Sequence, residues 1–335
     1  MSDTAEGLRR KIASAGDLQS VVRTMKALAA SSIGQYEESV RALADYDRTV
    51  ELGLGACFRA LGPLPATGRS GPAPDAIVAV VFGSDQGLVG QFNEVVVDFA
   101  METLATLPGK ARVWAVGERV HARLADAGVA LTKLLPVPSS VHAIGSLVGR
   151  ILVETGTGPT PVELAELHLF HNRPTSGAVF APVTRRLLPL DESWRRELLE
   201  LPWPTTGRPE ILGGDTDTLR ALIREHLFLS IFRACAESLA SENASRLSAM
   251  QRADRNIDDL LEELNGRSRR LRQSSIDEEL FDVIAAVEAL SNGKALGGER
   301  RECFRDVRPR IPVTVGIDAL AWTDLPRLAD AWADR

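Results

Sequence analysis

Cysteine, aromatic residues and long apolar runs are all scarce in this sequence. The three cysteines stand far apart, at positions 57, 235 and 303. An odd number at such spacing fits neither a disulfide framework nor a zinc site, so we expect reduced thiols in an intracellular protein and predict no metal site. Aromatic residues make up only 5% of the chain. Small side chains favour closely packed helices over a bulky core.

Membrane-spanning segments and an excess of positive charge are also missing. The densest apolar run, residues 76–82, is far shorter than the roughly 20 residues that cross a bilayer. The first residues are polar and do not resemble a signal peptide. The net charge of −6 argues against a nucleic-acid-binding protein, which is usually basic. We therefore expect membrane association only through partners, and no nucleic acid.

Helix breakers are absent over a long stretch. Residues 217–290 contain no proline and one glycine, Gly266, and apolar residues recur at three- and four-residue steps. A helix of that length extends for about 110 Å. The N-terminal segment has the same pattern, which is typical of a coiled coil; its apolar positions are Leu8, Ile12, Ala15, Val22, Met25, Ala29, Ile33, Tyr36, Val40, Leu43 and Val50. We predict a long antiparallel coiled coil, the alternative being two ordinary amphipathic helices of a bundle.

Two stretches rich in proline and glycine divide the chain. The predicted segments are an N-terminal coiled-coil helix (1–61), a linker (62–75), an α/β domain (76–201), a second linker (202–216), a long C-terminal helix (217–290) and a C-terminal extension (291–335). The predicted fold is therefore an α/β, Rossmann-like domain flanked by two long helices.

Within the α/β domain, β-branched runs alternate with amphipathic segments. We predict strands at 76–82, 111–116, 163–171 and 178–190, and helices at 93–107, 118–127 and 141–154. Strand–helix alternation that ends in a hairpin predicts a partly parallel sheet.

No catalytic constellation is recognisable. The loop Gly83–Gly90 lies between a predicted strand and a helix, where dinucleotides bind in some folds, but it matches neither G-x-G-x-x-G nor a P-loop. His168 and His171 have an odd separation within one predicted strand, so they point to opposite faces and cannot share a metal. We predict no catalytic, cofactor-binding or metal site, and keep open an α/β phosphate- or nucleotide-binding enzyme with helical oligomerisation arms.

Three ordered motifs resemble one family. Residues 22–31, VRTMKALAAS, resemble the N-terminal helix signature of the γ subunit of F-type ATP synthases. Residues 84–93, SDQGLVGQFN, are similar to its S-D-x-G-L-x-G-x-F-N loop, and residues 240–250, ASENASRLSAM, resemble its long C-terminal helix. The resemblance covers roughly residues 3–290. It implies a non-catalytic central shaft that couples ion-driven rotation of the c-ring to ATP synthesis or hydrolysis at the β subunits.

The same resemblance implies partners and a location. The partners are the ring of three α and three β subunits, the ε subunit and the c-ring, and the chain lies peripherally at the cytoplasmic face of the cell (inner) membrane. The residues matched to coupling contacts are Met25, Lys26, Arg270, Arg272, Gln273 and Glu278, while Gly87 and Gly90 match the base-domain loop and receive a backbone role.

Two features depart from that family. The usual helix ends near Leu290, whereas this sequence continues for another 45 residues, to Arg335. Glu278 stands where the family often has glutamine, which adds a charge. Divergence between the motifs suggests a variant F-type ATPase, with protons or sodium as the coupling ion; the ion site lies in other subunits.

Overall fold

The computed structural model describes residues 4–61, 77–109, 111–155, 166–176, 179–190, 192–207, 209–211 and 215–295. The chain divides into two compact units, residues 1–272 and residues 273–335. The predicted linker 62–75 lies outside the described residues, as do residues 296–335 of the predicted extension and parts of the linker 202–216. The two units are described separately below.

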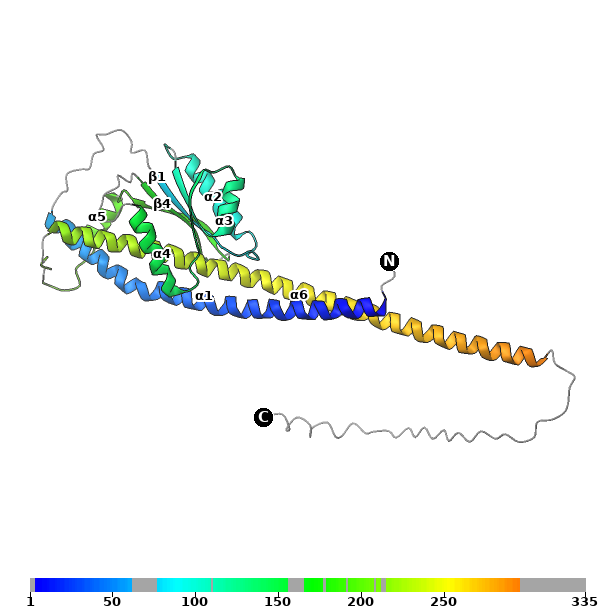
Figure 1. Ribbon diagram of the computed structural model, residues 1–335. Coiled ribbons are helices and arrows are strands. Elements are labelled where there is room, and N and C mark those ends of the chain that lie inside the picture. Colours follow the sequence, from blue (N-terminus) through cyan, green and yellow to red (C-terminus); the bar gives the residue numbers. More distant parts are fainter. Residues whose placement is uncertain are drawn as a thin grey trace. The chain divides into compact units, whose positions relative to one another are not determined.

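Two long helices account for nearly half of the chain (Figure 1). Helix α1 spans Ala5–Leu61, and helix α6 spans Asp215–Ala295. The Thr4 side chain caps α1 by accepting a hydrogen bond from the Gly7 backbone N–H at 3.2 Å. Helix α6 begins two residues before the predicted segment and ends five residues after it, because Gly266 and the residues following 290 do not interrupt it.

Helices α1 and α6 are antiparallel. As residue numbers increase along α1, those of the contacting residues in α6 decrease: Lys26 lies against Asp254, and Asp47 lies against Arg233. Between them, Val22 of α1 packs with Met250 and Ile257 of α6. This confirms the predicted antiparallel pair.

The contact between the two helices follows a seven-residue repeat. In α1 the buried positions are Leu8, Ala15, Val22, Ala29 and Tyr36, and in α6 they are Met250, Ile257 and Leu264. A seven-residue repeat is typical of left-handed coiled coils. Of the other predicted apolar positions, Val50 is buried near the C-terminal end of α1, and the rest, such as Ile12 and Met25, are only half-buried. The two helices therefore meet along a narrow seam, in which about one residue per heptad of each helix is fully buried.

A five-stranded sheet separates the helices in sequence. The strands are β1 (Ile77–Phe82), β2 (Ala111–Val116), β3 (Leu131–Leu135), β4 (Glu166–Arg173) and β5 (Ala181–Leu188). Their order is β3-β2-β1-β4-β5, and all neighbours are parallel except β4 and β5. The central strand β1 is buried along its whole length, as expected for a parallel strand covered on both faces.

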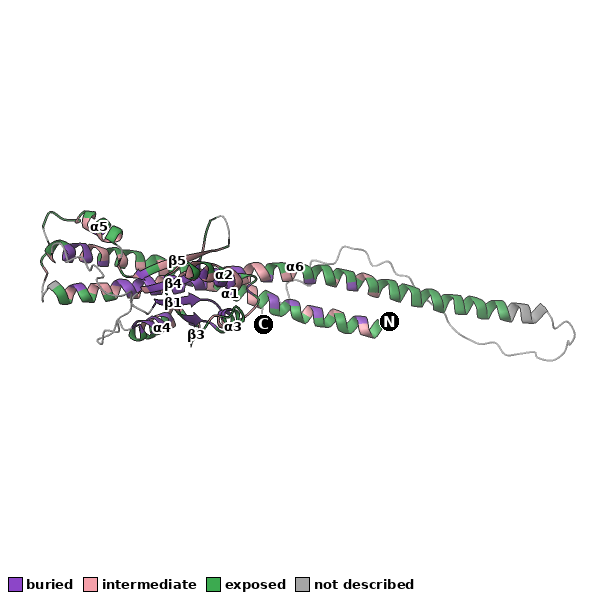
Figure 2. Ribbon diagram, turned by 90° about the horizontal axis from the view of Figure 1, so that it is seen from above, coloured by how far each residue is buried: buried purple, intermediate pink, exposed green. Residues whose placement is uncertain are grey.

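Helices cover the two faces of the sheet. Helices α2 (Phe92–Ala105) and α3 (Glu118–Asp126) pack on the face that carries Ala79 and Val81. Helix α4 (Val141–Glu154) and the first half of α6 pack on the opposite face, which carries Val78 and Val80. Figure 2 shows the buried residues concentrated where α6 passes the sheet. The α/β layer thus uses part of α6 as one of its own covering helices.

Two elements were not predicted. Strand β3 is a short edge strand with partly exposed side chains, so its apolar signal is weak. Helix α5 (Glu192–Glu200) has nine residues and lies next to the proline-rich stretch. Leu198 of α5 is buried with Leu54 and Phe58 of α1, which closes the C-terminal end of α1. Strand β2 and helix α4 have the predicted bounds, and the other elements differ from prediction by a few residues at their ends.

Candidate functional site

The polar residues of the coiled coil converge on Asp254 of α6. Its carboxylate accepts hydrogen bonds from Lys26 Nζ at 2.7 Å, from Arg23 Nε at 3.2 Å and from Gln19 Nε2 at 3.4 Å. Gln19 also donates to Asp258 at 2.5 Å. The three donors lie on α1, four and three residues apart, so they follow one another at about one helical turn on the face that meets α6. We call residues 19, 23, 26, 254 and 258 the cross-brace.

The charge state of the cross-brace follows from these contacts. Hydrogen bonding by Lys26, then by Arg23, lowers the pKa of Asp254, although partial burial opposes the shift. Asp254 is therefore a carboxylate at neutral pH, and its side chain is only 13% exposed. The cross-brace therefore stabilises the coil fully above the ordinary pKa of an aspartate, and this stabilisation is lost as the pH falls through the lowered pKa of Asp254.

Two predicted coupling residues belong to this region. Met25 is half-buried and packs against the apolar cluster of Val22, Met250 and Ile257. The Lys26 ammonium group pairs within the chain, yet its side chain remains 36% exposed. To bind a partner subunit, the Lys26 ammonium group would have to leave Asp254 or bind the partner and Asp254 together.

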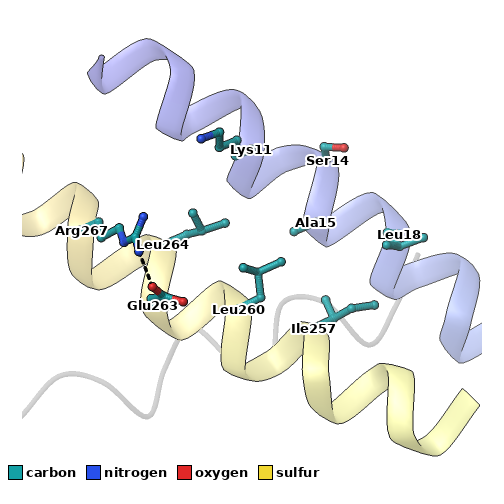
Figure 3. A pocket seen from close by; sticks show the side chains of 9 residues that line it. All are labelled: Lys11, Ser14, Ala15, Leu18, Ile257, Leu260, Glu263, Leu264 and Arg267. Carbon is teal, nitrogen blue, oxygen red and sulfur yellow. Dashed lines mark hydrogen bonds and ion pairs between the residues drawn. The ribbon is translucent and has the colours of Figure 1, made fainter. Parts of the chain in front are cut away.

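An open groove lies between α1 and α6 beside the seam (Figure 3). It has a volume of about 480 Å³, and its apolar lining comprises the exposed Leu18 and Leu260 and the buried seam residues Ala15, Ile257 and Leu264. Its rim carries Lys11 from α1 and the Glu263–Arg267 ion pair from α6. Leu18 and Leu260 are exposed, so the coil presents apolar surface as well as charge at this position.

The remaining predicted coupling residues lie farther along α6. Arg270 and Arg272 are exposed within the first unit. In the second unit, Gln273 and Glu278 are exposed as well, on a stretch of α6 whose large apolar side chains also face outward. These apolar side chains are Ile276, Leu280, Phe281, Val283, Ile284 and Val287. An exposed apolar helix surface of this extent is typical of a partner contact.

The loop that follows β1 is held by backbone and side-chain hydrogen bonds. The Ser84 N–H donates to Asn93 Oδ1 at 3.0 Å, and Asn93 Nδ2 donates to Ser84 Oγ at 2.9 Å. Gly90 has a φ of +58°, where glycine is favoured. Gly87 has no left-handed φ, and a Cβ there would meet only Arg119 at ordinary contact distance. The structure thus gives a conformational reason for glycine at position 90 but not at position 87.

Asp85 occupies the position that a phosphate would need at helix α3. Its Oδ1 accepts from the Glu118 backbone N–H at the start of α3, and its Oδ2 accepts from the Val137 N–H, both at 3.0 Å. A helix N-terminus attracts anions through such N–H groups. Here the chain's own carboxylate already satisfies it and ties together the ends of β1, β2 and β3. This arrangement leaves the start of α3 filled by the chain itself and not open to an external anion.

The two histidines of β4 form separate hydrogen bonds on opposite faces of the sheet. His168 bonds to Glu166 on one face of the sheet, and His171 bonds to Glu237 of α6 on the other. Their predicted opposite orientation is confirmed. Among the described residues, no group of three or more histidine, cysteine, aspartate or glutamate side chains could hold a metal. None of the described helices is long and apolar enough to cross a membrane.

Sequence reasoning missed the partners of the coupling residues. Gln19, Arg23 and Asp254 were not singled out, because their role depends on the register between helices that are more than 200 residues apart. The seven-residue spacing between Ala15 and Val22, and between Met250 and Ile257, identifies which side of each helix faces the other. It did not say which heptads face each other.

Known proteins resemble the chain along most of its length. The family model described as ATP synthase matches residues 4–290. An ATP synthase gamma chain from Frankia casuarinae is 27% identical over 303 residues, covering 85% of this chain and 97% of the relative. One from Mycobacterium sp. (strain KMS) is 28% identical over 316 residues, covering 87% and 99%.

Solved structures agree with the fold. A chain of the Euglena gracilis mitochondrial ATP synthase, OSCP/F1/c-ring, has a TM-score of 0.57 at 16% identity and covers 90% of this chain and 99% of its own. A chain of the Tetrahymena thermophila mitochondrial ATP synthase, central stalk/c-ring, has a TM-score of 0.51 at 18% identity, covering 70% and 99%. Because the family model matches well over half of the sequence, this chain belongs to the ATP synthase family, as a relative of the gamma chains.

Proposed function

We propose that this chain is the central rotor shaft of an F1Fo-type ATP synthase. It is a non-catalytic subunit that couples rotation of a c-ring to ATP synthesis or hydrolysis at β-subunit sites. The observation that carries the proposal is the antiparallel pair of α1 and α6, closed by a heptad seam and the cross-brace. Two helices joined in this way resist twisting, which is what transmission of rotation requires.

The partners follow from membership of the family. They are the α and β subunits of an α3β3 ring, the ε subunit and the c-ring. Solved structures of similar fold come from the rotor and from the OSCP/F1/c-ring assembly of the Euglena gracilis mitochondrial ATP synthase. We place the chain peripherally at the cytoplasmic face of the cell (inner) membrane, held there through these partners and without nucleic acid.

The shaft acts on the β sites through differential contact. A rotor can bias a site only by contacting its open and closed states differently. One side of the coil presents the open groove, while α/β elements cover another part of α6. A shaft with such unequal sides presents a different surface to each β subunit at any rotary angle.

We assign the coupling contacts to two regions. Met25 and Lys26 contact an acidic loop of β, with Lys26 exchanging between that loop and Asp254, which it binds at 2.7 Å. Arg270, Arg272, Gln273 and Glu278 are exposed on α6 and available as polar catches. Gly90, with its φ of +58°, shapes the loop after β1, and Gly87 lies in the same loop without a conformational requirement for glycine.

Replacing Lys26 by alanine tests both the partnership and the contact. The chain, co-expressed with its α and β subunits, should co-purify with them as a complex. Because the lost ammonium group stabilises only some rotary positions, the Lys26→Ala complex should hydrolyse ATP several-fold more slowly, with roughly 1–2 kcal/mol lost from one charged hydrogen bond. Nucleotide affinity, measured by fluorescence titration of the complex, should be retained.

The matched control is Lys11→Ala, which removes a lysine from the same helix at the rim of the groove. Its turnover should stay closer to that of the wild type. A wild-type chain that purifies without α and β would refute the shaft assignment. Equal effects of the two lysine variants would refute only the role given to Lys26.

A further inference from the structure

Three polar residues of α6 form a stripe against the α/β layer. Glu237, Ser241 and Ser245 follow each other at four-residue steps, so they share one face of the helix. The Ser241 hydroxyl donates to the Asn172 carbonyl at 3.0 Å, and the Ser245 hydroxyl donates to the Val89 carbonyl at 2.5 Å. Two successive turns of α6 are thus bonded to backbone atoms of the sheet layer.

The third contact of the stripe is ionic. Glu237 Oε2 lies 2.7 Å from His171 Nε2 and 2.9 Å from Arg173 Nε. Burial lowers the pKa of His171, so the ring is neutral at pH 7 and its Nε2–H donates to the carboxylate. Burial alone would raise the pKa of Glu237, but hydrogen bonds from His171 and Arg173 lower it. The carboxylate is therefore charged and held by two donors.

The receiving residues are themselves anchored. His171, Asn172 and Arg173 are consecutive at the end of β4. Asn172 is fully buried, and its Nδ2 donates to the Phe92 carbonyl at the start of α2, at 2.8 Å. Val89 belongs to the loop that Ser84 and Asn93 hold closed. The stripe on α6 is therefore connected to β4, α2 and the loop after β1.

The rest of the contact between α6 and the sheet is apolar. Leu227, Ile231, Ala234 and Leu239 pack there with side chains of the sheet and of α4. Apolar burial is non-directional, so it changes little when a helix turns slightly about its axis. A hydrogen bond weakens steeply once its angle is lost. Directional bonds at three turns fix the rotary position of α6, and apolar packing alone does not.

We propose that Glu237, Ser241 and Ser245 are positioning residues of a joint that passes torque between the α/β domain and helix α6. This inference rests on the proposed function, because it supplies the place where a turning domain would grip its shaft. The two serine contacts and the Glu237–His171 contact are short and largely shielded from water, whereas the Arg173 side chain is 46% exposed.

The first test uses the full chain and amide hydrogen exchange. In the double variant Ser241→Ala and Ser245→Ala, amides of residues 86–92 and 168–173 should exchange faster, by about fivefold for each hydrogen bond lost. Amides of β2 should be unaffected. The matched control is Ser238→Ala on the same helix: Ser238 is buried, but it lies one position after Glu237 and is therefore rotated by about 100° from the stripe. Unchanged exchange in the double variant would overturn the joint.

The second test uses the assembled complex in lipid vesicles. The double variant should hydrolyse ATP at close to the wild-type rate but transport fewer ions for each ATP, most visibly against an opposing gradient. Threonine at position 245 in place of alanine (Ser245→Thr) keeps the hydroxyl and should bring the number of ions transported per ATP back towards the wild-type value. Normal ion transport per ATP together with loosened exchange would overturn the joint as a torque carrier. If the wild-type complex does not couple hydrolysis to transport at all, the proposed function fails instead.

Discussion

Alanine at position 117 should destabilise the α/β layer more than most single methyl additions. Gly117 has a φ of +116°, and a Cβ there would lie 2.7 Å from the Ser84 carbonyl oxygen and 2.9 Å from the Ser84 nitrogen. Ser84 cannot move away, because its carbonyl accepts from the Arg119 N–H and its N–H donates to Asn93. We expect a loss of about 2–5 kcal/mol in the free energy of unfolding.

Gly128→Ala is the matched control for this prediction. Gly128 also has a positive φ, of +77°, but the described atoms leave open space within 4 Å of an added Cβ. That variant should lose only about 1–2 kcal/mol, the cost of a left-handed residue that is not glycine. Urea unfolding followed by circular dichroism compares the two. Equal losses would mean that the contact with Ser84 does not matter and would contradict the tight packing described here.

A carboxylate at position 257 should open the coiled coil. Ile257 is 7% exposed and packs with Val22 and Met250 in the seam between α1 and α6. An aspartate there would be buried without a partner, close to the carboxylates of Asp254 and Asp258 on the same helix. We expect Ile257→Asp to cost about 2–4 kcal/mol in pairing of the two helices. Trypsin should then cleave the first half of α1 much faster, after Arg23 and Lys26.

Leu260→Asp provides the control on the next turn of the same helix. Leu260 lines the open groove and is 45% exposed, so an aspartate there stays in water. Its effect on the isolated chain should be small, within about 0.5 kcal/mol. Equal tryptic cleavage of α1 in both variants would show that the seam does not hold the helices together. In the complex, we expect Ile257→Asp to weaken the transmission of rotation as well.

The long helices could be predicted because their signals are local. Apolar steps of three and four residues from Leu8 to Val50 indicated the seam of α1, and the absence of proline indicated the length of α6. Strand β1 was recognisable from its continuous apolar run. Strand β3 was missed because an edge strand alternates only weakly between apolar and polar residues. Short α5 was missed because its signal depends on burial of Leu198 against α1.

The polar contacts of the shaft were beyond prediction for a different reason. Lys26 was singled out from a motif, but its ion pair with Asp254 joins residues 228 positions apart. The same is true of Ser245 and Val89, whose bond depends on how α6 is rotated against the loop. Nothing in the local sequence fixes these pairings. They follow only when the heptad register and the sheet order are both set.

Several side chains of types common in active sites are used as structural contacts. The Asp85 carboxylate accepts hydrogen bonds that join the ends of three strands, and His171 and Glu237 form a contact between β4 and α6. Groups that would serve chemistry in an enzyme here hold elements in fixed orientation. The chain therefore acts through stiffness and through the unequal surfaces it presents, while its partners supply the reaction.

Rotation of the α/β domain under ATP is the most direct measurement of the central claim. The chain would be assembled with its α3β3 ring, the ring fixed to a surface, and a bead attached to the α/β domain. We predict one-directional turning of the bead while ATP is hydrolysed, stopping when ATP is removed. Hydrolysis by the assembled complex with a bead that only fluctuates about one angle would contradict the claim that this chain is a rotary shaft.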